Sequence, residues 1–201
     1  MHKQGKLKIG LLVNPIAGMG GKVGLHGTDD LLLQRAKDLG AKVVSSERTE
    51  RAIKSLLPQA SKISFFAPAG KMGEEVLESF NLPFEIVGEG SGLETTSADT
   101  QSAALAFMAK SVDVILFAGG DGTARDIFSV VGESIPILGI PAGVKMRSGV
   151  FANYPEEAAA IVLDAIASIE SGKELLFTNT EILDLTDSQP DYSQSHFFGS
   201  A

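Results

Sequence analysis

The chain has 201 residues, 44% hydrophobic and 21% charged, which suits one sizeable globular domain or one domain with part of another. Its net charge of −8 argues against a general nucleic-acid binder, and the absence of cysteine excludes disulfides, thiol catalysis and thiolate metal sites. No apolar run approaches the roughly 20 residues that span a bilayer, and the N-terminal segment lacks the apolar core of a signal peptide. We therefore expect a cytoplasmic protein that binds neither nucleic acid nor membrane.

The charge is unevenly distributed along the chain. Residues 1–55 carry ten Lys and Arg against five Asp and Glu, whereas residues 56–201 carry a net −13. The basic portion contains a glycine-rich stretch, so a small anionic ligand is plausible there. A solubilising surface explains the same imbalance, and charge alone does not decide between the two interpretations.

Short apolar runs alternate with segments whose apolar residues recur every three to four positions, the spacing of amphipathic helices. Near-continuous apolar strands separated by helices predict a doubly wound, mostly parallel α/β sheet covered on both faces. We assign residues 1–150 to this domain and 151–201 to a helix, an incomplete β segment and a mobile tail, which we interpret as the start of a small β-rich second domain. The predicted strands are 7–13, 42–44, 62–67, 84–87, 112–118 and 135–140, with one or two more in 173–186; the predicted helices are 29–40, 49–59, 73–80, 97–110, 122–131 and 154–172.

Glycine-rich or basic loops follow four of the predicted strands. In a parallel sheet these loops meet at the carboxyl edge, where ligands bind in this architecture. The sequence thus predicts that loops 14–28, 68–73, 119–123 and 141–149 lie together.

The stretch GGDGT at 119–123 follows a buried strand and begins a helix. Gly119, Gly120 and Gly122 allow backbone N–H groups to approach a phosphate at the positive end of that helix. Asp121 beside phosphate requires a bridging Mg²⁺ or a role in accepting a proton from an attacking hydroxyl. Thr123 caps the helix or binds a phosphate oxygen. The alternative is a simple turn in which Asp121 caps the helix.

Two other loops add candidates. The first loop contains Gly18, Gly20 and Gly21 and matches neither the Walker A pattern nor G-x-G-x-x-G, so neither a P-loop nucleotidase nor a standard dinucleotide fold is indicated. The loop after residue 140 holds Lys145, Arg147 and Ser148, which suit phosphate or ribose, although a turn with exposed bases fits nearly as well. Thr96 and Asp99 have the spacing of a capping box, and Thr95 remains unexplained.

These motifs resemble a known superfamily. GGDGT after a buried strand, with an earlier Asn14-Pro15-x-x-Gly18 loop, is similar to the NAD kinases, diacylglycerol kinases and 6-phosphofructokinases. The longer stretches 14–29, 119–127 and 139–152 resemble the ATP-NAD kinase-like branch that includes the acetoin-catabolism X protein. The resemblance implies Mg²⁺-dependent phosphoryl transfer from ATP or polyphosphate to the 2′-hydroxyl of NAD. It implies Asp121 as the catalytic aspartate, the other GGDGT residues around the phosphates, and Asn14 with its loop at the phosphates or ribose.

NAD kinases place a β-rich domain after the α/β domain, and here little sequence follows residue 185. The expectations are a shortened member, a fragment, or a site completed by partner chains in a homo-oligomer. Two other functions stay open: a regulatory module that binds NAD or ATP without catalysis, and a lipid kinase of the diacylglycerol type. The lipid kinase is less favoured because Val144 stands where that group has Thr in its P-x-G-T motif.

Overall fold

The computed structural model describes residues 5–17, 44–88, 95–143, 146–175, 177–185 and 195–200. A five-stranded parallel sheet has the order β3-β2-β1-β4-β5, so the predicted doubly wound α/β fold is confirmed. The strands are β1 (Leu7–Val13), β2 (Ile63–Ala67), β3 (Phe84–Ile86), β4 (Val114–Gly119) and β5 (Ile137–Pro141); the helices are α2 (Ser45–Leu56), α3 (Glu74–Ser79), α4 (Ser97–Lys110), α5 (Asp121–Val131) and α6 (Pro155–Glu170), with short 3-10 helices at Leu57–Lys62 and Gly70–Met72.

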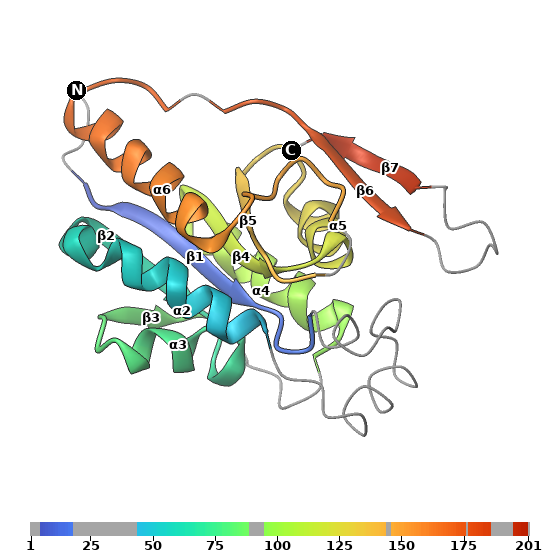
Figure 1. The fold of residues 1–201 in the computed structure, drawn as a ribbon, viewed down its shortest axis with the longest axis horizontal. Coiled ribbons are helices and arrows are strands. Elements are labelled where there is room, and N and C mark those ends of the chain that lie inside the picture. The colour runs from blue at the N-terminus through green and yellow to red at the C-terminus, as the bar shows by residue number, and fades with distance from the viewer. Residues whose placement is uncertain are drawn as a thin grey trace.

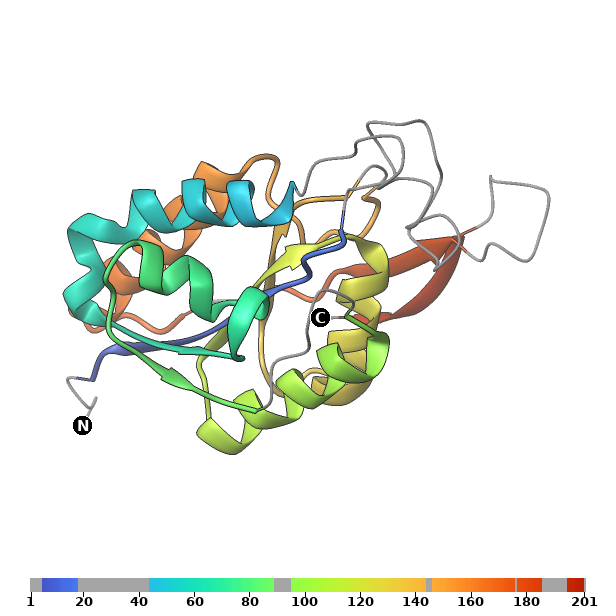
Figure 2. The same cartoon turned by 90° about the horizontal axis from the view of Figure 1, so that it is seen from below.

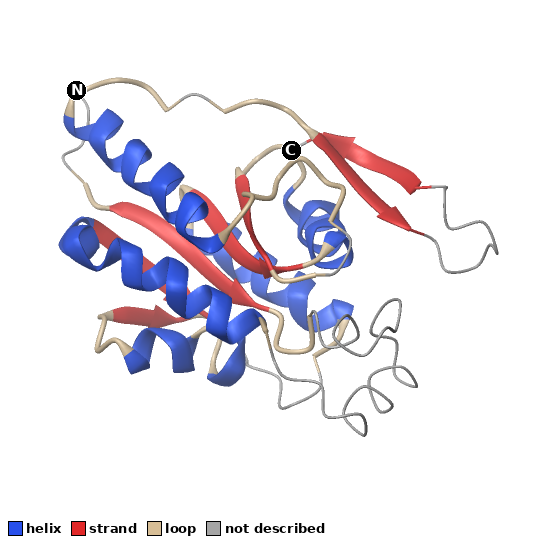
Figure 3. Cartoon of the chain, viewed as in Figure 1, coloured by secondary structure: helices blue, strands red, loops and turns tan. Residues whose placement is uncertain are grey.

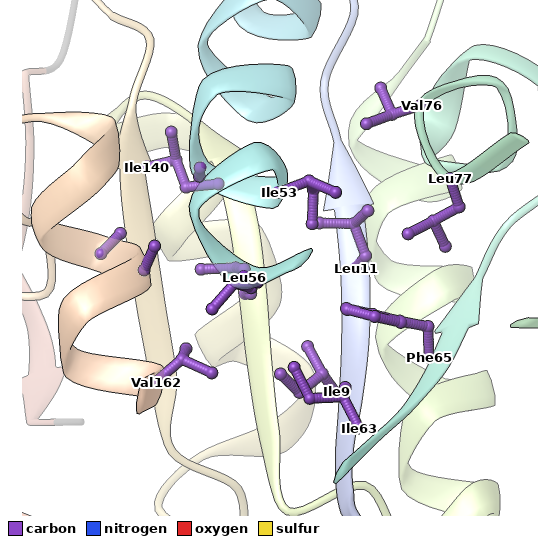
Figure 4. Close-up of a cluster of buried hydrophobic side chains, with 14 of the residues drawn as sticks. Ile9, Leu11, Ile53, Leu56, Ile63, Phe65, Val76, Leu77, Ile140 and Val162 are labelled. Atoms are coloured by element: carbon purple, nitrogen blue, oxygen red, sulfur yellow. The ribbon is translucent and has the colours of Figure 1, made fainter. Parts of the chain in front are cut away.

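Helices cover both faces of this sheet, and Figures 1 and 2 show the two layers. Helices α2, α3 and α6 pack on one face, where one apolar cluster joins them to the strands. Figure 4 shows side chains from α2, α3 and α6 converging on β1, β2 and β5 in this cluster. Helices α4 and α5 pack on the opposite face with a second cluster.

Alternation along β1 explains why one strand serves both layers. Ile9, Leu11 and Val13 belong to the first cluster, and Leu12 belongs to the second, since successive side chains of a strand point to opposite faces. All four side chains are at most 1% exposed. A strand buried on both faces has a near-continuous apolar sequence, which is the pattern of residues 7–13 apart from Lys8.

Local sequence signals set several helix boundaries. Helix α4 begins with the expected capping box, in which the Thr96 hydroxyl accepts from the Asp99 N–H and the Asp99 carboxylate accepts from the Thr96 N–H. Helix α6 has Pro155 in its first turn and is followed by Gly172 at φ +69°. Helix α2 starts at Ser45, four residues before the predicted start. The predicted helix 29–40 and strand residues 42–43 lie outside the described residues, and Val44 is the N-cap of α2.

Part of the C-terminal segment forms a strand that the sequence patterns did not predict. Residues 195–200 form β7, which pairs antiparallel with β6 (Glu181–Leu185) in a separate two-stranded sheet (Figure 3). The apolar pair Phe197-Phe198 is too short a signal to mark this strand, and the mobility expected of the tail stays a prediction. Residues 186–194 lie outside the described residues. The division of the chain at residue 150 stays a prediction, although α6 packs on the same core as β1.

Within the described ranges, no helix combines the length and the apolar character needed to cross a membrane.

Candidate functional site

The site lies at the carboxyl ends of β1 and β4, the two central neighbours of the sheet. The chain that follows β1 reaches α2 on one face, and the chain that follows β4 enters α5 on the other. Strands whose connections diverge in this way leave a crevice at the sheet edge, which is the general ligand position in open α/β folds. The loops at β1, β2, β4 and β5 share this edge, as predicted, as far as the described residues extend.

The glycines of GGDGT have different physical reasons. Gly119 ends β4, and a Cβ added there would lie 2.5 Å from the Thr123 Cβ and Oγ1, so packing within the protein requires glycine. A Cβ added at Gly122, in the first turn of α5, would meet nothing within 4 Å. No contact with a described residue therefore explains glycine at 122, where an alanine would favour the helix. Open space at a helix start suits the close approach of an anion.

The Asp121 carboxylate is 7% exposed and faces the loop after β5. Its Oδ1 accepts from the Ser148 hydroxyl at 2.6 Å, the Ser148 N–H at 2.9 Å and the Arg147 N–H at 3.1 Å. Its Oδ2 accepts from the Arg147 N–H at 2.9 Å. The alternative in which Asp121 caps α5 is wrong, because Gly120 is the N-cap and no side chain caps the helix. Asp121 instead fixes the position of residues 147–148.

Ser148 links Asp121 to β6. The hydroxyl is 2.6 Å from Asp121 Oδ1, 3.0 Å from the Leu183 carbonyl oxygen, and accepts from the Leu183 N–H at 3.0 Å. Since a hydroxyl has one proton, the shorter contact and the charge of the acceptor favour donation to Asp121. The Gly149 N–H also donates to the Glu181 carbonyl at 2.9 Å. Strand β6 is thus fastened to the loop that holds the carboxylate.

Asn14 joins three segments at the same edge. Its Oδ1 accepts from the Ile16 N–H at 3.1 Å and from the Thr95 hydroxyl at 3.2 Å, while its Nδ2 donates to Thr123 Oγ1 at 3.0 Å. This explains Thr95, which is 8% exposed and had no assigned role. Thr123 is 5% exposed and does not cap its helix. Asn14 and Thr123, 109 positions apart, are in direct contact.

Arg48 is a residue that the sequence patterns did not single out. It lies in α2, and its guanidinium donates to the Pro141 carbonyl at the end of β5. Helical periodicity marks the apolar face of α2 and gives no signal for a half-buried cation on its first turn. Arg147, by contrast, is exposed, as expected for a turn with exposed basic residues. Its backbone N–H donates to Asp121. Lys145 and the glycines at 18, 20 and 21 lie outside the described residues.

The described residues contain no group of three or more His, Asp or Glu that could hold a metal ion alone. Mg²⁺ at phosphoryl-transfer sites uses one or two carboxylates together with substrate phosphates and water. Asp121 Oδ2, which accepts one hydrogen bond among the described residues, retains a lone pair for such a ligand. The donor set therefore fits a metal that arrives with a nucleotide.

Comparison with known proteins supplies the family. A search of curated protein sequences finds no match to the chain. The sequence model of the ATP-NAD kinase N-terminal domain matches residues 9–170, which run from within β1 to the end of α6 and include every described residue of the site except those of β6. The chain therefore belongs to the ATP-NAD kinase family.

Proposed function

We propose that this chain is an NAD kinase-like phosphotransferase that moves a phosphoryl group from ATP, or from polyphosphate, to the 2′-hydroxyl of NAD. Membership of the family supports kinase chemistry and nucleotide binding at the family level. The observation that carries the proposal is the juxtaposition of a held carboxylate, Asp121, with the unobstructed first turn of α5 at Gly122. Phosphoryl transfer needs positioning and charge stabilisation more than covalent chemistry, and this site offers both.

In this proposal the phosphates lie against the start of α5. The backbone N–H groups of the first helical turn have no helical partner, and the helix dipole favours an anion there. Gly119 and Gly120 set the strand-to-helix turn, and Gly122 leaves room for the ligand. The resemblance places the loop after Asn14, with Gly18, Gly20 and Gly21, at the same ligand. The residue types of Lys145 and Ser148 suit its phosphate or ribose.

Asp121 is the proposed base for the acceptor hydroxyl. Its Oδ1 already accepts three hydrogen bonds, so the reacting atom is Oδ2, which accepts one among the described residues. Oδ2 would take the proton of the 2′-hydroxyl as that oxygen bonds to the terminal phosphorus of the donor, and the bond from that phosphorus to the bridging oxygen breaks to release ADP or a shortened polyphosphate. Bound Mg²⁺, held by the nucleotide phosphates and water while Oδ2 acts as the base, would neutralise charge on the transferring oxygens.

A second candidate is a module that binds NAD or ATP without catalysis. The observation in its favour is that the Asp121 carboxylate already accepts four hydrogen bonds from Arg147 and Ser148. These bonds give it a structural role that needs no reaction. Both candidates share the nucleotide site and differ only in turnover.

The test is a nucleotide titration followed by an assay. Calorimetry with NAD, ATP and Mg-ATP measures binding, and enzymatic detection of NADP⁺ with ATP or polyphosphate as donor measures transfer. Binding with NADP⁺ formation supports the kinase; binding without NADP⁺ under either donor supports the module. Absence of binding to every nucleotide contradicts both.

We also propose that copies of the chain associate in the cytoplasm as a homo-oligomer. Phe177 is 58% exposed just before β6, and in the described part of the chain β7 pairs with β6 alone, so the other edge of β7 can pair with a further strand. Ile182, in contrast, is fully buried against the α5 layer, which removes part of the apolar surface expected in 173–185. Multi-angle light scattering at high concentration tests the proposal, and a single monomeric species contradicts it.

A further inference from the structure

The orientation of the Asn14 carboxamide is fixed by its surroundings. The Ile16 N–H can only donate, so the atom that faces it at 3.1 Å must be the carboxamide oxygen. The amide nitrogen then faces Thr123 Oγ1 at 3.0 Å, and as an NH₂ group it can only donate. The direction of this hydrogen bond follows from the backbone at residue 16.

The direction of that bond determines where the Thr123 proton points. Because Thr123 Oγ1 accepts from Asn14, its own proton is turned away from Asn14 and needs another acceptor. Among the described residues none accepts it. Thr123 is 5% exposed, and a buried hydroxyl whose proton lacks a partner is uncommon in folded proteins. Thr123 lies in the first turn of α5, where open space at Gly122 leaves room for a ligand that could supply the acceptor.

We propose that Asn14 is a positioning residue that makes the Thr123 hydroxyl a donor to a phosphate oxygen of the bound nucleotide. The inference rests on the proposed function and deepens it, since it assigns Asn14 a role different from direct contact with phosphate or ribose. Three of the hydrogen-bonding positions of the Asn14 carboxamide are already used within the protein, which leaves one N–H. The ligand chemistry is a phosphate oxyanion, the strongest available acceptor for a hydroxyl.

Asn14→Asp is the variant that reverses the bond without removing it. An aspartate at 14 still accepts from the Ile16 N–H and the Thr95 hydroxyl. It cannot donate to Thr123, so the Thr123 hydroxyl turns and donates to it instead. The contacts that hold the fold remain, while the donor toward the ligand is lost.

The experiment is a double-mutant cycle read by calorimetry with metal-free ATP and by thermal melting. Thr123→Val keeps the shape of the side chain and removes the hydroxyl, and the cycle combines it with Asn14→Asp. We expect each single variant to weaken ATP binding by about tenfold or more, the effect of one hydrogen bond to a charged group. In a protein that already carries Thr123→Val, the Asn14→Asp change can weaken ATP binding only through its charge. The double variant should therefore lose much less ATP affinity than the product of the two single fold-losses.

Two controls separate the role of Asn14 from stability. Thr123→Ser keeps the hydroxyl and should retain binding and its dependence on Asn14. Thr95→Val removes a hydrogen bond to the same Asn14 oxygen. We expect this variant to have a lower melting temperature and nearly unchanged ATP affinity. Adenosine, which lacks phosphate, should bind the wild type and the Asn14→Asp variant alike. If the fold-losses of ATP affinity in the two single variants multiply in the double variant, the inference is overturned and the proposed function is not. If the wild-type protein binds neither ATP nor NAD, both are overturned.

Discussion

Gly122→Ala is the variant that best separates the fold from the ligand site. Glycine in a helix is less stable than alanine by about 0.5–1 kcal/mol because its backbone loses more freedom on folding. The added Cβ meets no atom within 4 Å, and the φ angle at 122 lies outside the positive range, so no strain offsets this gain. For a chain of this length the expected rise in melting temperature is about 1–4 °C.

Nucleotide affinity should move in the opposite direction. The alanine methyl group would occupy the open space at the first turn of α5, where the proposed phosphate approaches the backbone. Displacing the phosphate from one backbone N–H removes one hydrogen bond to a charged group, which corresponds to about 10- to 100-fold in affinity. Differential scanning fluorimetry measures the melting temperature, and calorimetry with NAD and ATP measures the affinity.

Gly119→Ala is the matched control. Its Cβ would lie 2.5 Å from Thr123 Oγ1, so this substitution should lower the melting temperature instead of raising it. A Gly122→Ala protein that is more stable and binds nucleotide as tightly as the wild type would refute the placement of the phosphate at this helix start. A Gly122→Ala protein that is less stable than the wild type would refute the claim that the space beside Gly122 is open.

Three further predictions follow from other contacts. Asp121→Asn should lower NADP⁺ formation by ~10²–10⁴, the range for loss of a positioned base, and unchanged turnover would leave Asp121 only its role in holding the loop. Ser148→Ala should reduce the free energy of unfolding in a urea titration by about 1–3 kcal/mol, because Asp121 loses its shortest donor and the Leu183 N–H loses its acceptor; an unchanged midpoint would show that the link to β6 contributes nothing. The hydrogen bond from Arg51, followed by a backbone hydrogen bond, holds the pKa of Glu156 below its ordinary value of 4.5, so its contribution to α2–α6 packing is present above pH 4.5 and lost as the pH falls through the lowered pKa. The difference in melting temperature between wild type and Glu156→Gln should therefore be present at neutral pH and shrink as the pH falls below 4.5, and a difference independent of pH would contradict this origin.

The parts of the fold that the sequence predicts correctly are those set by local chemistry. Helix α4 has the predicted bounds because Thr96 and Asp99 cap each other within one turn. Strand β1 has the predicted bounds because it is buried on both faces and therefore apolar apart from Lys8. Helix α2 begins earlier than predicted. Ser45 and Thr49 are fully buried but polar, so the spacing of apolar residues gives no sign of a helix in this first turn. The Thr49 hydroxyl donates to the Ser45 carbonyl oxygen, so this buried hydroxyl has its hydrogen-bond partner within the same turn of the helix.

The candidate site was predictable as a place and not as a set of contacts. The rule that loops meet at the carboxyl edge of a parallel sheet brings Asn14 and Asp121 to one edge without knowledge of any side chain. The partners of Asp121 are 26 and 27 positions away, and they depend on how the chain folds after β5. The contact between Asn14 and Thr95 spans 81 positions and has no signal in either local sequence. Such contacts depend on tertiary packing.

The contacts of Asp121 reconcile its structural and its proposed chemical role. A carboxylate near the N-terminus of a helix is stabilised by the dipole, and the donors from residues 147–148 hold it in place before any ligand binds. Charge that is oriented in advance requires no reorganisation during the reaction, which is the main source of electrostatic catalysis. The saturation of Oδ1 then has a consequence for the mechanism: a proton accepted there would break the bonds that position the group, whereas a proton accepted at Oδ2 would leave three of the four intact. The structural bonds thus select which oxygen can act as the base.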